Sequence, residues 1–177
     1  MNIDVKDIYE FSSLRIACHV ESVNYFAGLL GYHFPEHDND KNSEPMRTGY
    51  AYIIYAMYHK NFHLLPEHEQ LCHDAKQNHH KHSTHHAAYY ANIADIPDVK
   101  IYEMVADWAS ANFEQKNIIH VKDAICLNEW FEQNNAQIPW TTHQLEIIRK
   151  SIQIIKENTD QAYVQKIWKP VLEKSDL

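Results

Sequence analysis

The segment RIACHVESVNYFAGLLG, residues 15–31, decides the fold class predicted for this chain. Its apolar side chains recur at helical spacing, at Ile16, Val20, Val23, Phe26 and Leu30. Because Gly31 follows as a stop signal, we predict a first helix over about residues 4–30. Only three glycines occur in 177 residues, and alternating β-branched runs are almost absent. The sequence therefore predicts an all-α protein without Gly-rich phosphate loops.

Helix signals continue outward from this segment. The further helices are expected over residues 46–65, from Pro66, from Pro97, over 120–134, over 142–157 and around Trp168. Thr141 and Gln144 have the spacing of a capping box, whereas residues 33–45 are too rich in Asp, Asn and Pro to be regular throughout. A chain of this length with 45% apolar residues normally forms one domain around one core, so we expect residues 1–177 to form a single domain.

Composition limits the classes of partner. A formal net charge of −8 argues against binding to long nucleic acid through many phosphate contacts. No signal-peptide pattern and no apolar stretch of about eighteen residues is present, which predicts a soluble cytoplasmic protein without a membrane partner. The three cysteines Cys18, Cys72 and Cys126 fit neither a disulfide framework nor a CxxC zinc site. A small anionic ligand remains compatible, because a bound divalent cation reverses the local charge.

Fourteen residues are histidine, and several of them fall into an order that is typical of metal sites. The ordered set is His19, the pair His37 and Asp38, then His80, His85 and His86, and finally Asp107. Neutral imidazole and carboxylate are ligands for Mn, Fe, Co, Ni and Zn, and Mg is also compatible with the carboxylates. The pattern predicts a metal site assembled from several helices.

This order resembles the HD-domain superfamily of metal-dependent phosphohydrolases, and within it a group of small phage and bacterial proteins. The shared motifs are HDxxK at residues 37–41, HK at 80–81, HH at 85–86 and EMxxDW at 103–108. The resemblance covers about residues 15–110, and residues 120–174 add C-terminal helices without a usable motif. An HD dipeptide alone carries little information, whereas the ordered set with EMxxDW is more specific.

The resemblance implies an HD-like helical bundle with one or two divalent ions in its core. The first ion would be held by His19, His37, Asp38 and Asp107. A second ion or the substrate phosphate would lie against His80, His85, His86 and Arg15, the last of which shares a helix face with His19 and has a guanidinium suited to phosphate. The implied catalytic residues are Asp38, Lys41 and His80. Asp38 is the natural bridge between two ions.

Plainer interpretations of the same residues stay open. Asp107 could lie on a solvated helix face with Glu103 and Glu114, and His19 could be an ordinary packed histidine. Arg15 and Lys41 could be surface residues. The histidine tract at 79–86 could be a metal-scavenging or low-complexity run, although a break near Ser83 would let its members approach one site from different directions. His73 and Asp74 form a rival dyad, but the spacing from His19 favours His37 and Asp38.

The resulting hypothesis is a phosphohydrolase that uses metal-activated water on a small phosphate ester, such as a nucleotide or cyclic nucleotide. Its location would be the host cytoplasm if the chain is phage-encoded, and a homodimer is compatible with the sequence. One alternative is a di-iron oxygenase of HD-like fold, because the same architecture hosts both chemistries. Another is a non-catalytic protein that binds metal or sequesters a nucleotide. No GxSxG or HExxH motif supports a serine hydrolase or a zinc protease.

Overall fold

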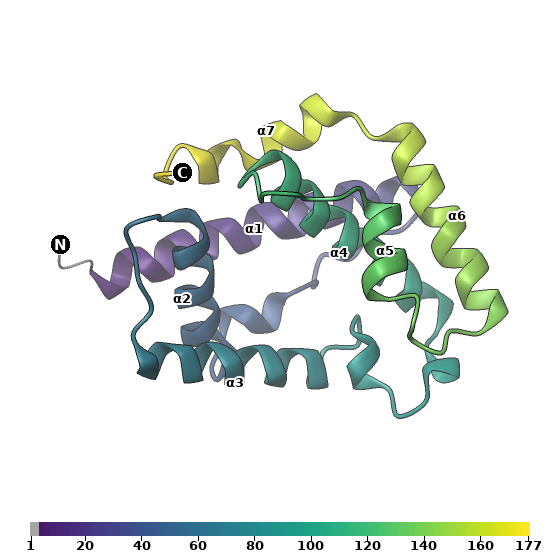
Figure 1. The fold of residues 1–177 in the computed structure, drawn as a ribbon, viewed down its shortest axis with the longest axis horizontal. Coiled ribbons are helices and arrows are strands. Elements are labelled where there is room, and N and C mark those ends of the chain that lie inside the picture. Colours follow the sequence, from purple (N-terminus) through teal and green to yellow (C-terminus); the bar gives the residue numbers. More distant parts are fainter. Residues whose placement is uncertain (1–3) are drawn as a thin grey trace.

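Helices account for all the regular structure in the computed structural model, which describes residues 4–177 (Figure 1). The α-helices within that range are α1 (Val5–Leu29), α2 (Met46–Tyr58), α3 (Pro66–His82), α4 (Asp98–Asn117), α5 (Leu127–Asn134), α6 (Thr142–Asn158) and α7 (Gln161–Leu172). Three 3₁₀ turns lie at Asn39–Asn42, Ala87–Tyr89 and Ile93–Asp95. No strand occurs among these residues, which confirms the predicted all-α class.

Helix α1 runs along the long axis of the molecule and is its central element (Figure 1). Asp4 caps its start by accepting a hydrogen bond from the backbone N–H of Lys6 at 2.9 Å. Gly31 follows its end with a φ of 84°, a conformation that glycine adopts without steric cost. Helices α2, α4 and α7 pack against α1, so its apolar residues are covered on several sides.

Helices α2 and α3 form a closely packed pair. A Cβ atom added to Gly49 on α2 would lie 2.5 Å from the Cβ of Ala75 on α3, so the absence of a side chain permits this close approach. The predicted 46–65 helix was too long, because the backbone becomes extended at His59 and stays irregular until Pro66. Helix α3 begins at Pro66 as predicted and ends before Ser83, where a break was expected.

The C-terminal half follows the predicted boundaries with one exception. The helix expected over 120–134 begins only at Leu127, because His120 and Asp123 have φ values of 49° and 62°, which interrupt a helix. At α6 the predicted capping box is confirmed. The backbone N–H of Gln144 donates to Thr141 Oγ1 at 3.2 Å, and the backbone N–H of Thr141 donates to Gln144 Oε1 at 3.0 Å.

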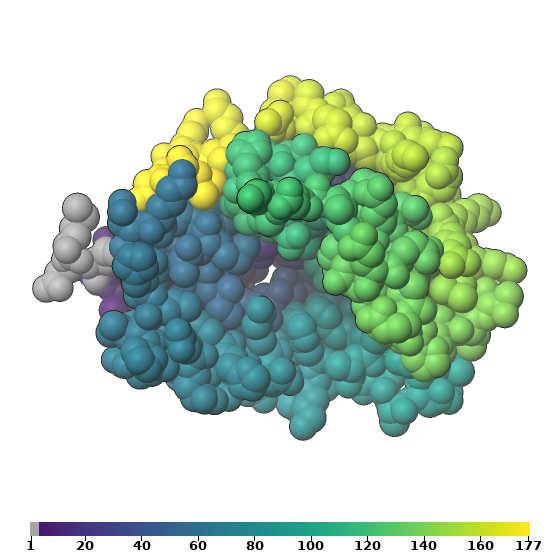
Figure 2. All heavy atoms as spheres, in the orientation of Figure 1, coloured from purple at the N-terminus to yellow at the C-terminus, as the bar shows by residue number. Residues whose placement is uncertain are grey.

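One hydrophobic core connects α1, α2, α4, α6 and α7. Its largest fully buried side chains include Phe26, Tyr58, Ile101, Ile148 and Trp168. Burial of each such apolar side chain contributes about 1.5–3 kcal/mol. The face in Figure 2 is hollowed between α2 and α3 on one side and α4 and α5 on the other. None of the helices within residues 4–177 combines the length and the apolar character that crossing a membrane requires.

Charged and polar side chains are also buried within the fold. The buried histidines, carboxylates and arginine are Arg15, His19, His37, Asp38, His79, His85, Glu103 and Glu114. Because a buried charge is costly unless it is paired or bound to a metal, this concentration requires a specific explanation.

Candidate metal centre

The loop between α1 and α2 places His37 and Asp38 at the centre of the buried polar cluster. Asn24 on α1 anchors this loop by donating through its amide to the carbonyl oxygen of Phe34 at 3.1 Å. Asp38 has a left-handed backbone with a φ of 58°, a conformation that Asp tolerates better than most residues. Such a conformation costs about 1–3 kcal/mol and is typical of functional sites. Both residues are only 2% exposed.

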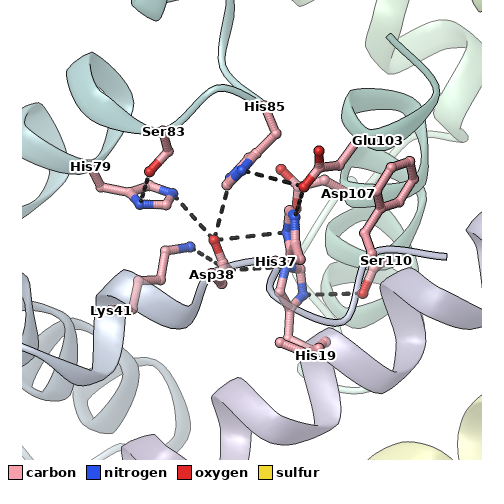
Figure 3. Close-up of polar contacts among 12 residues, drawn as sticks. His19, His37, Asp38, Lys41, His79, Ser83, His85, Glu103, Asp107 and Ser110 are labelled. Carbon is pink, nitrogen blue, oxygen red and sulfur yellow. Dashed lines mark hydrogen bonds and ion pairs between the residues drawn. The ribbon is translucent and has the colours of Figure 1, made fainter. Parts of the chain in front are cut away.

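A first group of possible ligands consists of His19, His37, Asp38 and Asp107. The Nε2 atom of His19 lies 3.0 Å from Asp107 Oδ1 and 3.4 Å from Asp38 Oδ2. The Nε2 atom of His37 lies 3.5 Å from the same Asp107 oxygen (Figure 3). Helix α1, the loop and α4 therefore bring together the four residues that the sequence predicted for one ion.

A second group consists of Asp38, His79, His85 and His86. The Oδ1 atom of Asp38 lies 3.2 Å from His79 Nε2 and 3.4 Å from His85 Nε2. The Nε2 atoms of His79 and His86 are 2.8 Å apart. The three histidines can present ligand atoms that all lie within 4.8 Å of one another. Asp38 thus lies between the two groups, with Oδ2 towards His19 and Oδ1 towards His79 and His85.

His79 is the histidine that the sequence prediction did not select. The prediction named His80, which is exposed and whose ring lies 4.4 Å from that of His86 at the edge of the second group. Adjacent residues on a helix point about 100° apart, so His79 and His80 cannot both face inward. The buried stripe of α3 consists of Cys72, Ala75 and His79. Helical spacing from the first two could have identified His79.

In His19, His37 and His79, the second ring nitrogen, Nδ1, contacts a polar side chain. The Nδ1 atoms of His19 and His37 lie 3.1 Å from Ser110 Oγ and 3.1 Å from Glu103 Oε1, respectively. The Nδ1 atom of His79 lies 2.8 Å from an Asp40 carboxylate oxygen. When Nδ1 carries the hydrogen, each imidazole donates to its oxygen partner and keeps the Nε2 lone pair for a metal.

Within residues 4–177, three buried ligand atoms have no hydrogen-bond partner. They are His37 Nε2, Asp38 Oδ1 and His85 Nε2. Leaving a buried polar atom unsatisfied costs about 1–3 kcal/mol, and such an atom in a folded protein requires an explanation. A divalent cation would satisfy all three, and the nitrogen and oxygen donor set suits Mn, Fe, Co, Ni or Zn. The residues present therefore fit a metal ion.

Burial and neighbouring charges shift the pKa values of several residues in the cluster. Burial lowers the pKa of His37, but Asp38, Asp107 and Glu103 outweigh burial and raise this pKa to about 10. Burial raises the pKa of Asp38, but Lys41 and the histidines outweigh it and hold this pKa well below 3.8. Burial, followed by the neighbouring Arg15, lowers the pKa of His19. Without metal, the His37 imidazole therefore carries a proton near neutral pH.

Metal binding is expected to release protons. Because a protonated His37 cannot be a ligand, the apparent affinity should increase with pH up to a pKa of about 10. The increase should be about tenfold for each pH unit that His37 controls. Titration calorimetry at pH 7 in two buffers with different ionisation enthalpies should give different binding enthalpies. Identical enthalpies in the two buffers would contradict this proton release.

Of the two cationic residues predicted to contact the phosphate, Lys41 and Arg15, only Lys41 lies beside Asp38. Lys41 lies at the site, where its Nζ donates to Asp38 Oδ2 at 2.6 Å and lies 4.6 Å from the centre of the Tyr50 ring. Arg15 instead pairs with Glu114 in the interior, with Nε donating to Oε1 at 2.9 Å. The guanidinium of Arg15 is therefore committed to a carboxylate.

Two of the plainer interpretations, the solvated face of α4 and the rival dyad His73 and Asp74, disagree with the structure. Glu103 and Glu114 are 4% and 1% exposed, so these two carboxylates do not lie on a solvated face of α4. His73 and Asp74 are both exposed on α3, and Asp74 accepts a hydrogen bond from Gln70. Figure 3 shows instead that the ring of His37 and the carboxylate of Asp38 lie among the side chains of the cluster.

The chain matches a family model over most of its length. A model described as a family of unknown function, DUF5662, matches residues 9–166. The chain belongs to the DUF5662 family. Both groups of this DUF5662 protein, from His19 to Asp107, lie within the matched residues. No curated protein and no solved structure gives a significant match.

Proposed function

We propose that this DUF5662 protein is a metal-dependent phosphohydrolase that acts on a small phosphate ester. The supporting observation is the convergence of the Nε2 atoms of four histidines, His19, His37, His79 and His85, on the carboxylates of Asp38 and Asp107. The Nε2 atom of His86 adjoins them, 2.8 Å from His79 Nε2. The clustered residues, apart from His79, belong to the ordered set that resembles the HD-domain superfamily. Geometry and resemblance thus agree on His19, His37, Asp38, His85, His86 and Asp107, and they differ at His79 and His80.

The two groups suit two divalent ions. The first ion would be held by His19, His37, Asp38 and Asp107, and the second by Asp38, His79, His85 and His86. When bound, such ions acidify water and polarise a phosphoryl oxygen, which favours in-line displacement at phosphorus. Asp38 would serve both ions, because Oδ2 faces His19 while Oδ1 faces His79 and His85.

The remaining residues would orient the ester and handle protons. In the reaction, the oxygen of water bonds to phosphorus and the phosphorus–oxygen bond of the ester breaks. One proton of the water is lost, the departing alkoxide takes up a proton, and the second proton of the water stays with the phosphate. Lys41 holds Asp38 in place and adds positive charge beside the phosphoryl group. We assign His80, at the exposed edge next to His86, a contact with the phosphate or the supply of this proton.

A cavity of about 400 Å³ reaches the cluster. Its lining includes Phe34, His37, Asp38, Ser83, His85 and Lys100. This volume is within the range of about 300–1,000 Å³ that is typical of small-molecule sites. The cavity therefore suits a small phosphorylated molecule better than a polymer.

The test is incubation of the protein, loaded in turn with Mn, Co, Fe or Mg, with nucleoside monophosphates, cyclic nucleotides and p-nitrophenyl phosphate. Release of inorganic phosphate, or of a linear product from a cyclic nucleotide, is expected with at least one metal. Intact nucleotide recovered in complex would instead support sequestration. Oxygen uptake by coloured, iron-loaded protein without phosphate release would support the di-iron oxygenase alternative.

A further inference from the structure

His37 and His85 lie side by side between two carboxylates. Their ring centroids are 4.2 Å apart. On one side, Asp38 Oδ1 lies 3.8 Å from His37 Nε2 and 3.4 Å from His85 Nε2. On the other side, Glu103 Oε1 lies 3.1 Å from His37 Nδ1 and 3.7 Å from His85 Nδ1 (Figure 3). One oxygen of Glu103 therefore faces one histidine of each group.

Lys100 contacts one of the two oxygens of the Glu103 carboxylate. Glu103 is 4% exposed. Its second carboxylate oxygen, Oε2, accepts a hydrogen bond from Lys100 Nζ at 2.7 Å. Lys100 precedes Glu103 by three residues on α4, so the two side chains lie on the same helix face. Because Oε2 is engaged by Lys100, Oε1 is left to accept from the imidazoles.

The other supporting contacts each serve one group. Ser110 contacts Nδ1 of His19 in the first group, whereas Asp40 and Ser83 contact Nδ1 of His79 in the second. Among the side chains described for residues 4–177, Glu103 has the only carboxylate that faces the Nδ1 atoms of histidines from both groups. Its removal should therefore affect both groups at once.

We propose that Glu103 is a positioning residue that couples the loading of the two metal positions. This inference rests on the two-ion form of the proposed function. An ion bound to His37 Nε2 would fix that ring with its Nδ1 hydrogen on Glu103. The fixed carboxylate would then orient His85, so that the second ion binds with less loss of conformational entropy.

The experiment is a Co²⁺ titration of metal-free protein, followed by calorimetry and by visible absorption, which reports ligand geometry. In the wild type we expect two ions to bind with coupled affinities. Glu103→Gln keeps the shape of the side chain but removes its charge. We expect it to weaken both positions by about 10–100-fold, to reduce their coupling and to change the absorption of both ions.

Single-group controls make this result specific. Ser110→Ala should weaken only the first position, and Asp40→Asn only the second. Lys100→Met removes the contact to Oε2 but leaves Glu103 facing the imidazoles, so it should produce a smaller loss at both positions. Circular dichroism of each metal-free variant checks that the fold is retained. If Glu103→Gln does not fold, Lys100→Met alone tests the prediction.

The coupling would be overturned if Glu103→Gln weakened one position only, or neither, or if the wild type bound a single ion. If only Lys100→Met can be tested, a loss of metal affinity at one position only would also overturn the coupling. These outcomes are distinct from failure of the proposed function. Wild-type protein that binds two coupled ions but hydrolyses no ester would contradict the phosphohydrolase assignment and leave the role of Glu103 intact.

Discussion

The Asp38→Asn variant is expected to lose metal from both positions. Asn is nearly the same size as Asp and also tolerates the left-handed conformation, so the loop at a φ of 58° should be retained. The change removes a carboxylate that faces the Nε2 atoms of both groups and leaves a neutral amide. The affinity loss should exceed the about 10–100-fold that removal of a supporting contact costs. Elemental analysis and metal titration of the purified variant would measure this loss.

Asp74→Asn is the matched control for this experiment. Asp74 belongs to the rival dyad with His73, and both residues are exposed on α3. Its metal content should equal that of the wild type. Loss of metal from Asp74→Asn equal to that from Asp38→Asn, or full metal content in Asp38→Asn, would contradict the assignment of Asp38.

The largest effect on stability is expected from Arg15→Met. Glu114 is 1% exposed, and its carboxylate accepts hydrogen bonds from the Arg15 guanidinium and from the Tyr58 hydroxyl, the latter at 2.5 Å. Removing only Arg15 would leave a buried negative charge without its cation. Breaking a buried ion pair in this way costs about 3–5 kcal/mol. Urea unfolding of the metal-free variant and wild type would measure the difference in free energy of unfolding.

The double variant Arg15→Met with Glu114→Gln tests the electrostatic cause. It removes both charges, keeps similar side-chain volumes and leaves the glutamine oxygen to accept from Tyr58. Much of the lost free energy of unfolding should therefore be recovered, because no uncompensated charge remains. A double variant as unstable as Arg15→Met would show that lost packing, including the contact of Arg15 with Trp168, dominates instead.

Local signals in the sequence predicted most helix boundaries. The apolar spacing of α1, the proline at the start of α3 and the capping box of α6 are each contained within a few residues, and each was found in the structure. The late start of α5 was not predictable in this way. His120 and Asp123 adopt positive φ values although neither residue type requires them, so nothing in the sequence marks the interruption.

The site was predictable where residue order carried information. The motif set named the members of the first group, which the fold brings together. His79 was missed because a run of histidines does not show which member faces inward. The burial of Glu103 and the pairing of Arg15 with Glu114 were also not foreseen, since both depend on packing between helices. Arg15 and Glu114 are 99 positions apart in the chain.

Helix α3 packs against α2 and the Ala87–Tyr89 turn, and its His79 reaches Asp38 at the centre of the molecule. An ion bound there would link the α2–α3 pair to α1 and α4. The unfolded chain cannot assemble ligands from such distant segments. The free energy of metal binding therefore adds to the free energy of unfolding and stabilises the packing of α3. Loading with metal should therefore slow amide hydrogen exchange in α3 and raise the melting temperature as the ion concentration increases.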